Sequence, residues 1–155
     1  MRTFSNKRRV RHAAADMFDL VEDVENYPQF VPLCRALRVT DRKQLGDEIE
    51  VLTADMTVAY KLIQETFTSR VTLDRPHLRI AVEYLNGPFS HFDNRWTFIP
   101  LGERECEIEF YIAYEFRSRT LGILMGTMFD TAFRRFATAF ERRADVVFAA
   151  APAHS

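Results

Sequence analysis

The sequence predicts an α+β fold: a curved antiparallel sheet of seven strands wrapped around a long C-terminal helix, with two short helices after the first strand. Two observations lead to this prediction. Over the last third of the chain, apolar residues recur in the i, i+3, i+4, i+7 pattern of a helix with one buried face. Before it lie short segments of alternating apolar and polar residues separated by turn residues, which is typical of antiparallel strands. A long helix needs a large packing partner, and the sheet is the expected one. A sheet that curves around a helix tends to enclose an apolar cavity.

The first 30 residues predict one strand and two short helices. Residues 2–11 form the expected strand, and Ala13–Val21 the first helix. A second helical piece covers Val24–Phe30. It is short because Pro28 and Pro32 interrupt the backbone hydrogen-bond pattern and disfavour helix in the residue before them.

Six further strands are expected, joined by short turns that make consecutive strands antiparallel neighbours. The strands are Ala36–Arg42, Asp47–Met56, Tyr60–Leu73, Leu78–Tyr84, His91–Ile99 and Glu105–Phe116. The turns are Leu45–Asp47, Asp74–Pro76, Asn86–Pro88 and Pro100–Gly102. The last strand alternates most clearly, with apolar residues at even positions and mainly glutamates at odd ones. For Asp47–Met56 the pattern does not choose a buried face.

The C-terminal helix is expected to run from about Ser118 to Phe148, which corresponds to ~45 Å. Gly122 and Gly126 lie four residues apart in its first half. Each costs about 1 kcal/mol of helix stability relative to alanine. We therefore expect residues 122–128 to be a mobile end beside the entrance of the cavity.

Composition and charge narrow the function. The chain has 155 residues, 47% of them hydrophobic, and a formal net charge of −1. These values predict a single domain over residues 1–149, a frayed tail at 150–155, and no binding to DNA. No apolar run of 18 residues and no signal-peptide pattern occurs in the sequence. We expect a cytoplasmic protein, with peripheral contact to the inner, cytoplasmic face of the membrane as a variant of that expectation.

Several segments resemble one known family. They are Phe18–Cys34 (FDLVEDVENYPQFVPLC), Glu65–Val71 (ETFTSRV), Asn86–Phe89 (NGPF), Arg95–Phe98 (RWTF) and Ala139–Ala144 (AFERRA). Together they resemble the coenzyme Q-binding protein family of the START-like, or polyketide cyclase-dehydrase, superfamily. The resemblance implies the helix-grip fold. It also implies one of three activities, because members are described as ubiquinone-binding chaperones for respiration, as ribosome-association toxins, or as cyclases and dehydrases.

Three groups of side chains are candidates for a ligand site. The apolar wall is expected to comprise Phe67, Val71, Trp96, Phe110, Leu121, Leu124, Met125, Met128 and Phe129. A polar rim that orients a head group is expected from Glu65, Asn94 and Tyr114. The entrance is expected at two proline-containing corners: Tyr27, Phe30, Pro32, Gly87, Pro88 and Phe89. Both corners also have an ordinary structural reading, as turns whose aromatic side chains fold back onto the core. No metal site and no catalytic group is predicted, because the four histidines are scattered.

The leading hypothesis is therefore non-enzymatic binding of a hydrophobic lipid, most simply ubiquinone or a related isoprenoid quinone, with transient contact to a membrane surface and no required cofactor. A ribosome-associated inhibitor is the first alternative, and it would use the basic side chains Lys7, Arg8, Arg9 and Arg11. Lys7, Arg9 and Arg11 have a structural explanation too: if the first strand lies beside the last, they face Glu105, Glu107 and Glu109 across the sheet. A cyclase or dehydratase is the second alternative, and it would need an acid–base group inside the cavity, for which Glu65 is the candidate. Glu65 also has an ordinary explanation, as the ion-pair partner of Arg35, Arg70 or Arg95 at the cavity rim.

Overall fold

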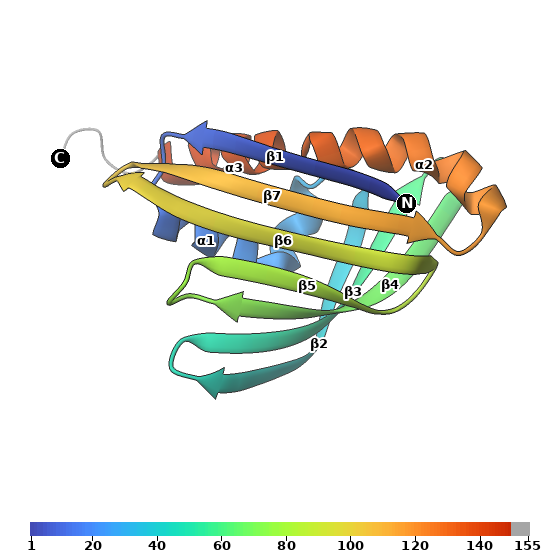
Figure 1. The fold of residues 1–155 in the computed structure, drawn as a ribbon, viewed down its shortest axis with the longest axis horizontal. Coiled ribbons are helices and arrows are strands. Elements are labelled where there is room, and N and C mark those ends of the chain that lie inside the picture. The colour runs from blue at the N-terminus through green and yellow to red at the C-terminus, as the bar shows by residue number, and fades with distance from the viewer. Residues whose placement is uncertain (150–155) are drawn as a thin grey trace.

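The computed structural model describes residues 1–149, and the tail expected at 150–155 lies outside the described residues. The C-terminal helices run one after the other along a strongly curved antiparallel sheet, which is the predicted helix-grip arrangement (Figure 1). In chain order the elements are β1 (Arg2–Val10), α1 (Ala14–Glu22), the 3-10 helix η1 (Val24–Gln29), β2 (Cys34–Gly46), β3 (Ile49–Tyr60), β4 (Ile63–Asp74), β5 (Arg79–Asn86), β6 (Phe89–Gly102), β7 (Glu105–Phe116), α2 (Arg119–Arg134) and α3 (Phe136–Ala149). Among residues 1–149, no helix is both long and apolar enough to cross a membrane.

The sheet has seven strands in the order β1-β7-β6-β5-β4-β3-β2. Strands β2 to β7 are joined by short turns, whereas β1 pairs with β7 at the far end of the chain. In this register Lys7 lies opposite Glu109, and their side chains form an ion pair of 3.4 Å. The side chain of Arg9 pairs with Glu105 at 3.3 Å. The structural explanation of the basic N-terminal segment is confirmed for these two residues.

The boundaries of several strands differ from the prediction. The expected strand Tyr60–Leu73 begins only at Ile63, because the chain turns at Lys61 and Leu62 and β3 continues to Tyr60. Lys61 adopts a positive φ of 56°, a conformation that glycine or asparagine usually signals and lysine does not.

Two expected turns also lie elsewhere. The segment Pro100–Gly102 is not a turn: it belongs to β6, where a register shift between Pro100 and Gly102 accommodates the proline. The turn predicted at Leu45–Asp47 occurs at Asp47 and Glu48 instead, with φ of 59° at Glu48.

The expected single C-terminal helix is divided into α2 and α3 at Arg135. The backbone of Arg135 (φ −97°, ψ −5°) leaves ideal helical geometry, and its N–H donates to the carbonyl of Ala132 at 3.0 Å, three residues earlier. This tightened turn keeps the rings of Phe133 and Phe136 in contact, with centroids 5.1 Å apart. No proline or glycine marks the break, so the sequence pattern does not reveal it.

The core lies between the inner face of the sheet and the helices. In β7 the even-numbered side chains from Cys106 to Tyr114 are buried, as the alternation predicts. Burial raises the pKa of the Cys106 thiol to about 11, so the thiol stays protonated and packs as a small apolar group. The structure also settles the face of β3, because Leu52, Ala54 and Val58 are buried.

Candidate ligand-binding cavity

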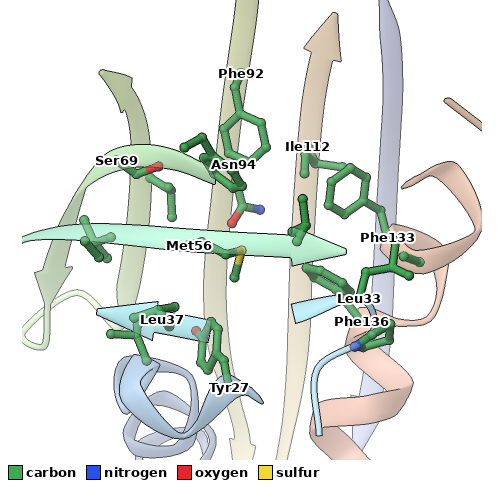
Figure 2. Close-up of a pocket in the computed structure, with 18 of the residues that line it drawn as sticks. Tyr27, Leu33, Leu37, Met56, Ser69, Phe92, Asn94, Ile112, Phe133 and Phe136 are labelled. Carbon is green, nitrogen blue, oxygen red and sulfur yellow. The ribbon is translucent and has the colours of Figure 1, made fainter. Parts of the chain in front are cut away.

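An apolar cavity of about 80 Å³ lies between the inner face of the sheet and the region where α2 meets α3 (Figure 2). The sheet contributes Leu37, Ala54, Met56, Val58, Phe67, Ser69, Val71, Ile80, Val82, Phe92, Asn94, Trp96 and Ile112. The helices and the corner after η1 contribute Val24, Tyr27, Pro32, Leu33, Phe129, Ala132, Phe133, Phe136 and Phe140. Four half-buried lining residues meet at this corner, and we call them the cavity mouth: Tyr27, Pro32, Leu33 and Leu37. Met56, Val82 and Phe136 are half-buried lining residues elsewhere.

Side-chain size explains why this region is hollow. Strand alternation turns Ala54 of β3 and Ser69 of β4 inward at paired positions, so two small side chains lie next to each other on one wall. On the opposite wall, α2 presents Ala132. Where large side chains do not fill the space between packed elements, a void remains.

Several candidate wall residues line the cavity and others do not. Phe67, Val71, Trp96 and Phe129 are part of the lining. Phe110 lies behind it, with its ring centroid 4.7 Å from that of Trp96. The remaining candidates from the first half of α2 lie outside the lining, either buried against the sheet or partly exposed to solvent: Leu121, Leu124, Met125 and Met128. The cavity lies beneath Phe129 to Phe140, further along the helices than the sequence predicts.

The first half of α2 packs closely against β1 at Gly126. A Cβ atom at this position would lie 3.1 Å from Nη2 of Arg2, because the arginine side chain of β1 crosses the helix there. The glycine therefore permits a close approach between α2 and β1. At Gly122 the nearest atom to such a Cβ belongs to Phe116, at 3.7 Å, which is an ordinary contact.

The two predicted entrance corners have different positions. Tyr27 and Pro32 line the cavity, and the Tyr27 hydroxyl donates to the carbonyl of Val21. Burial raises the pKa of Tyr27, so this hydroxyl stays protonated. Phe30 lies outside the lining and packs edge-on against Phe140, with ring centroids 5.0 Å apart. This corner is the one that adjoins the cavity.

The second corner, Gly87–Phe89, is packed shut and does not line the cavity. The Phe89 side chain has no exposed surface, and its ring lies 4.9 Å from Phe116 and 5.4 Å from Phe67. Gly87 has φ of 145°, and a Cβ there would lie 2.5 Å from the Cβ of Phe67. This corner is therefore a turn whose aromatic side chain folds back onto the core.

The three polar residues predicted at the rim do not form one group in the structure. Asn94 lines the cavity, whereas Glu65 and Tyr114 do not. The Tyr114 hydroxyl donates to the carbonyl of Gly126 at 3.3 Å and so connects β7 to α2. Burial raises the pKa of Tyr114 to about 12. Glu65 sits near the start of β4, opposite Val58 and two residues before Phe67, where the strand enters the lining.

Sequence reasoning missed Ser69. Its side chain is 4% exposed, and its hydroxyl has no hydrogen-bond partner in the described part of the chain. A signal was available in the sequence, because strand alternation places Ser69 on the same face as Phe67 and Val71. A serine at such a position places a hydroxyl in an apolar interior.

The lining contains no ionisable side chain other than Tyr27 among the residues that the structure describes. Within the same residues no group of three or more histidine, cysteine, aspartate or glutamate side chains is arranged to hold a metal ion. What this arrangement can do chemically is bury apolar surface and offer hydrogen bonds at Ser69 and Asn94. Such a site suits binding of a mainly hydrophobic molecule.

A basic groove adjoins the cavity mouth and shares Pro32 with it. The groove runs between α3 and the corner after η1, and comprises Phe30, Pro32, Arg135, Thr138, Ala139, Arg142, Arg143 and Val146. The Arg143 guanidinium donates to Oε1 of Gln29 at 2.5 Å and lies over the ring of Phe30. In contrast, Arg8 in the basic N-terminal segment is paired with Glu141 at 2.6 Å.

Comparison with known proteins places the chain in a family. Residues 10–141 match the family described as polyketide cyclase / dehydrase and lipid transport. The chain belongs to this family. A relative named ribosome association toxin RatA, from Vibrio cholerae, is 32% identical over 148 residues, covering 96% of this chain and 99% of the relative. The mitochondrial coenzyme Q-binding protein COQ10 homolog B of Xenopus laevis is 28% identical, covering 94% of this chain and 59% of that protein.

Solved structures agree on the fold. A START superfamily protein from Mycobacterium smegmatis superposes with a TM-score of 0.77 at 19% identity, covering 94% of this chain and 98% of that one. The helix-grip architecture expected from the sequence is therefore confirmed. The family description covers lipid transport as well as cyclases and dehydrases, so family membership alone does not determine the activity of this chain.

Proposed function

We propose that the protein binds a hydrophobic lipid in this cavity without transforming it, and that the lipid is an isoprenoid quinone such as ubiquinone. The observation that carries the proposal is the cavity itself: among the described residues, its lining is almost entirely apolar, with polar groups at Ser69, Asn94 and the Tyr27 hydroxyl. Transfer of an isoprenoid tail into such a site gains about 25 cal/mol for each Å² of apolar surface removed from water.

The size of the cavity sets a condition on this proposal. A volume of about 80 Å³ is well below the ~300–1,000 Å³ of typical ligand pockets. A quinone therefore enters only if side chains at the mouth move. Leu33 and Leu37 of the mouth are half-buried, and so is Met56, which pairs with Leu37 across β2 and β3. Methionine adapts easily to a new neighbour. The proposal includes opening at this corner, and contact of the same corner with a membrane surface during loading.

The similarity to the Xenopus laevis protein, whose name states coenzyme Q binding, supports this choice of ligand. A role in supplying quinone for respiration would follow from it. The cyclase or dehydratase alternative receives less support, because an acid–base mechanism needs a group that exchanges protons near neutral pH. Tyr27 is the ionisable side chain of the described lining, and burial raises its pKa further above neutral pH.

The proposal is tested by the lipid that the protein carries when purified. Native mass spectrometry, followed by organic extraction, should find an isoprenoid quinone on the wild-type chain. Ala54→Leu fills the cavity and should abolish the bound quinone. Ala81→Leu is the matched control, since Ala81 lies on the outer face of β5 between the inward residues Ile80 and Val82, and it should retain the quinone. A wild-type chain that neither carries a quinone nor takes one up when it is added would refute the proposal.

Ribosome association is a second candidate, favoured by the basic groove and by the names of relatives such as the Vibrio cholerae protein. The hypothesis based on the N-terminal basic residues is weakened, because Lys7, Arg8 and Arg9 are engaged in ion pairs. The groove offers Arg135 and Arg142 to an RNA phosphate backbone instead. Co-sedimentation with ribosomal subunits should then be lost in Arg135→Ala/Arg142→Ala and should fall steeply with salt. Unchanged co-sedimentation of this variant would exclude the groove as the ribosome-binding surface.

A further inference from the structure

The Ser69 hydroxyl is a buried hydrogen-bonding group that the protein leaves unused. It belongs to a side chain that is 4% exposed, and the described residues supply it with neither donor nor acceptor. Buried polar groups are almost always paired, because an unmade hydrogen bond in an apolar interior destabilises the fold. A buried group without a partner, aimed into a cavity, points to something that occupies that cavity.

The position of Ser69 is fixed by the sheet. Strand β4 places it on the inner face between Phe67 and Val71, opposite Ala54 on β3 and Tyr84 on β5. Figure 2 shows its side chain among the cavity residues, on the side away from Tyr27 and Leu37 of the mouth. A molecule that passed from the mouth to the far side of the cavity would reach Ser69 there.

Asn94 supplies a second polar group on the same wall, and its orientation is determined by two hydrogen bonds. The side-chain amide of Asn94 donates to the carbonyl of Tyr111 at 2.9 Å, and its Oδ1 accepts from the indole N–H of Trp96 at 3.1 Å. An asparagine amide carries two N–H groups. The second one has no acceptor among the residues described, so Asn94 can also donate to a ligand.

We propose that Ser69 and Asn94 form an inner head-group site for the oxygen atoms of a carbonyl-bearing ring, and that the ligand enters head first with its tail toward the mouth. This inference rests on the proposed function and makes it specific. The inner wall offers two hydrogen-bond donors, which match carbonyl oxygens. The mouth consists mainly of apolar surface, which matches a hydrocarbon tail. This orientation of the ligand is the reverse of the one expected from the sequence, in which a polar rim held the head group.

Trp96 provides the readout, because it is the single tryptophan of the chain, lines the cavity and contacts Asn94. Decylubiquinone is titrated into the purified protein while tryptophan fluorescence is followed, since quinones quench this fluorescence on contact. Decylbenzene, which has the tail and a ring but no carbonyl oxygens, is measured by its ability to displace decylubiquinone.

The test variant is Ser69→Ala. A lost neutral hydrogen bond should weaken decylubiquinone binding by up to about tenfold. The affinity for decylbenzene should stay the same, because that ligand has no acceptor. The melting temperature of the unliganded variant should be equal or higher, since an unpaired buried hydroxyl is removed. Ser5→Ala, on the exposed outer face of β1, is the control and should change neither value.

Two outcomes would overturn the inference separately from the proposed function. Equal decylubiquinone affinity in the wild type and in Ser69→Ala would reject the inner head-group site while leaving quinone binding intact. The same conclusion follows if decylbenzene binds the wild type as tightly as decylubiquinone. If decylubiquinone does not quench Trp96 in the wild type at all, the proposed function itself fails, and this inference fails with it.

Discussion

The two ends of the interface between the sheet and the C-terminal helices differ in how they are filled. Beneath the first half of α2, the rings of Phe89, Tyr114 and Phe116 pack against one another, with centroid separations between 4.9 and 6.1 Å. They also pack against Phe129, where the cavity begins. We call this the aromatic end. Beneath the junction of α2 and α3, the same two layers enclose the cavity, and we call this the hollow end. The aromatic end holds the layers together, and the hollow end contains the cavity in which we propose that the ligand binds.

Side-chain volume, rather than the pattern of apolar positions, separates the two ends. Both are built from the same alternation of strand residues and the same helical spacing. At the hollow end the inward positions carry Ala54 and Ser69, with Ala132 on α2. A pattern that only distinguishes apolar from polar positions treats phenylalanine and alanine alike, so it cannot locate a void.

The largest expected effect compares one phenylalanine at each end. Phe89→Ala should lower the free energy of unfolding by about 3–5 kcal/mol, because a fully buried ring is removed from close packing. Phe136→Ala should cost roughly half of that, since Phe136 is half-buried and already borders empty space. Urea denaturation measures both. Equal losses of stability would show that the two ends are packed equally closely, which would contradict the difference described above.

A smaller effect is expected at the turn that closes the aromatic end. Gly87→Ala should cost about 2–3 kcal/mol, because the new Cβ would lie 2.5 Å from the Cβ of Phe67 and the residue has φ of 145°. Gly46→Ala is the matched control. Apart from its chain neighbours, no atom lies within 4 Å of the place that its new Cβ would take. Thermal denaturation should therefore place this variant within about 1 kcal/mol of the wild type. If Gly87→Ala were as stable as the control, the corner would not be the rigid closure described above.

Much of the fold could be predicted from the sequence. The alternation in β7 identified its buried face, and the short turns identified antiparallel neighbours. The opposite charges of Lys7 and Glu109 were consistent with β1 lying beside β7, where the structure pairs them. The break at Arg135 could not be predicted, because it depends on a local change of hydrogen bonding with no proline or glycine in the sequence.

The site was harder to predict than the fold, for a physical reason. Helical spacing identifies the buried stripe of α2 and α3 but not which part of the stripe faces a gap. The helical part of the wall was therefore predicted at Leu121–Phe129, whereas the helices line the cavity from Phe129 to Phe140. Ser69 was overlooked because a small polar residue on a strand resembles a solvent-facing position until its neighbours are known.

A change in stability smaller than that of Gly87→Ala accompanies the most direct test of the central claim, that the hollow end is the ligand site. Ala54→Leu should alter the free energy of unfolding by no more than about 1.5 kcal/mol, because the added carbon atoms enter existing space. Titration of decylubiquinone, followed by Trp96 fluorescence, should show saturable binding to the wild type and to Ala81→Leu, and none to a folded Ala54→Leu. Equal saturation of all three chains would contradict the claim.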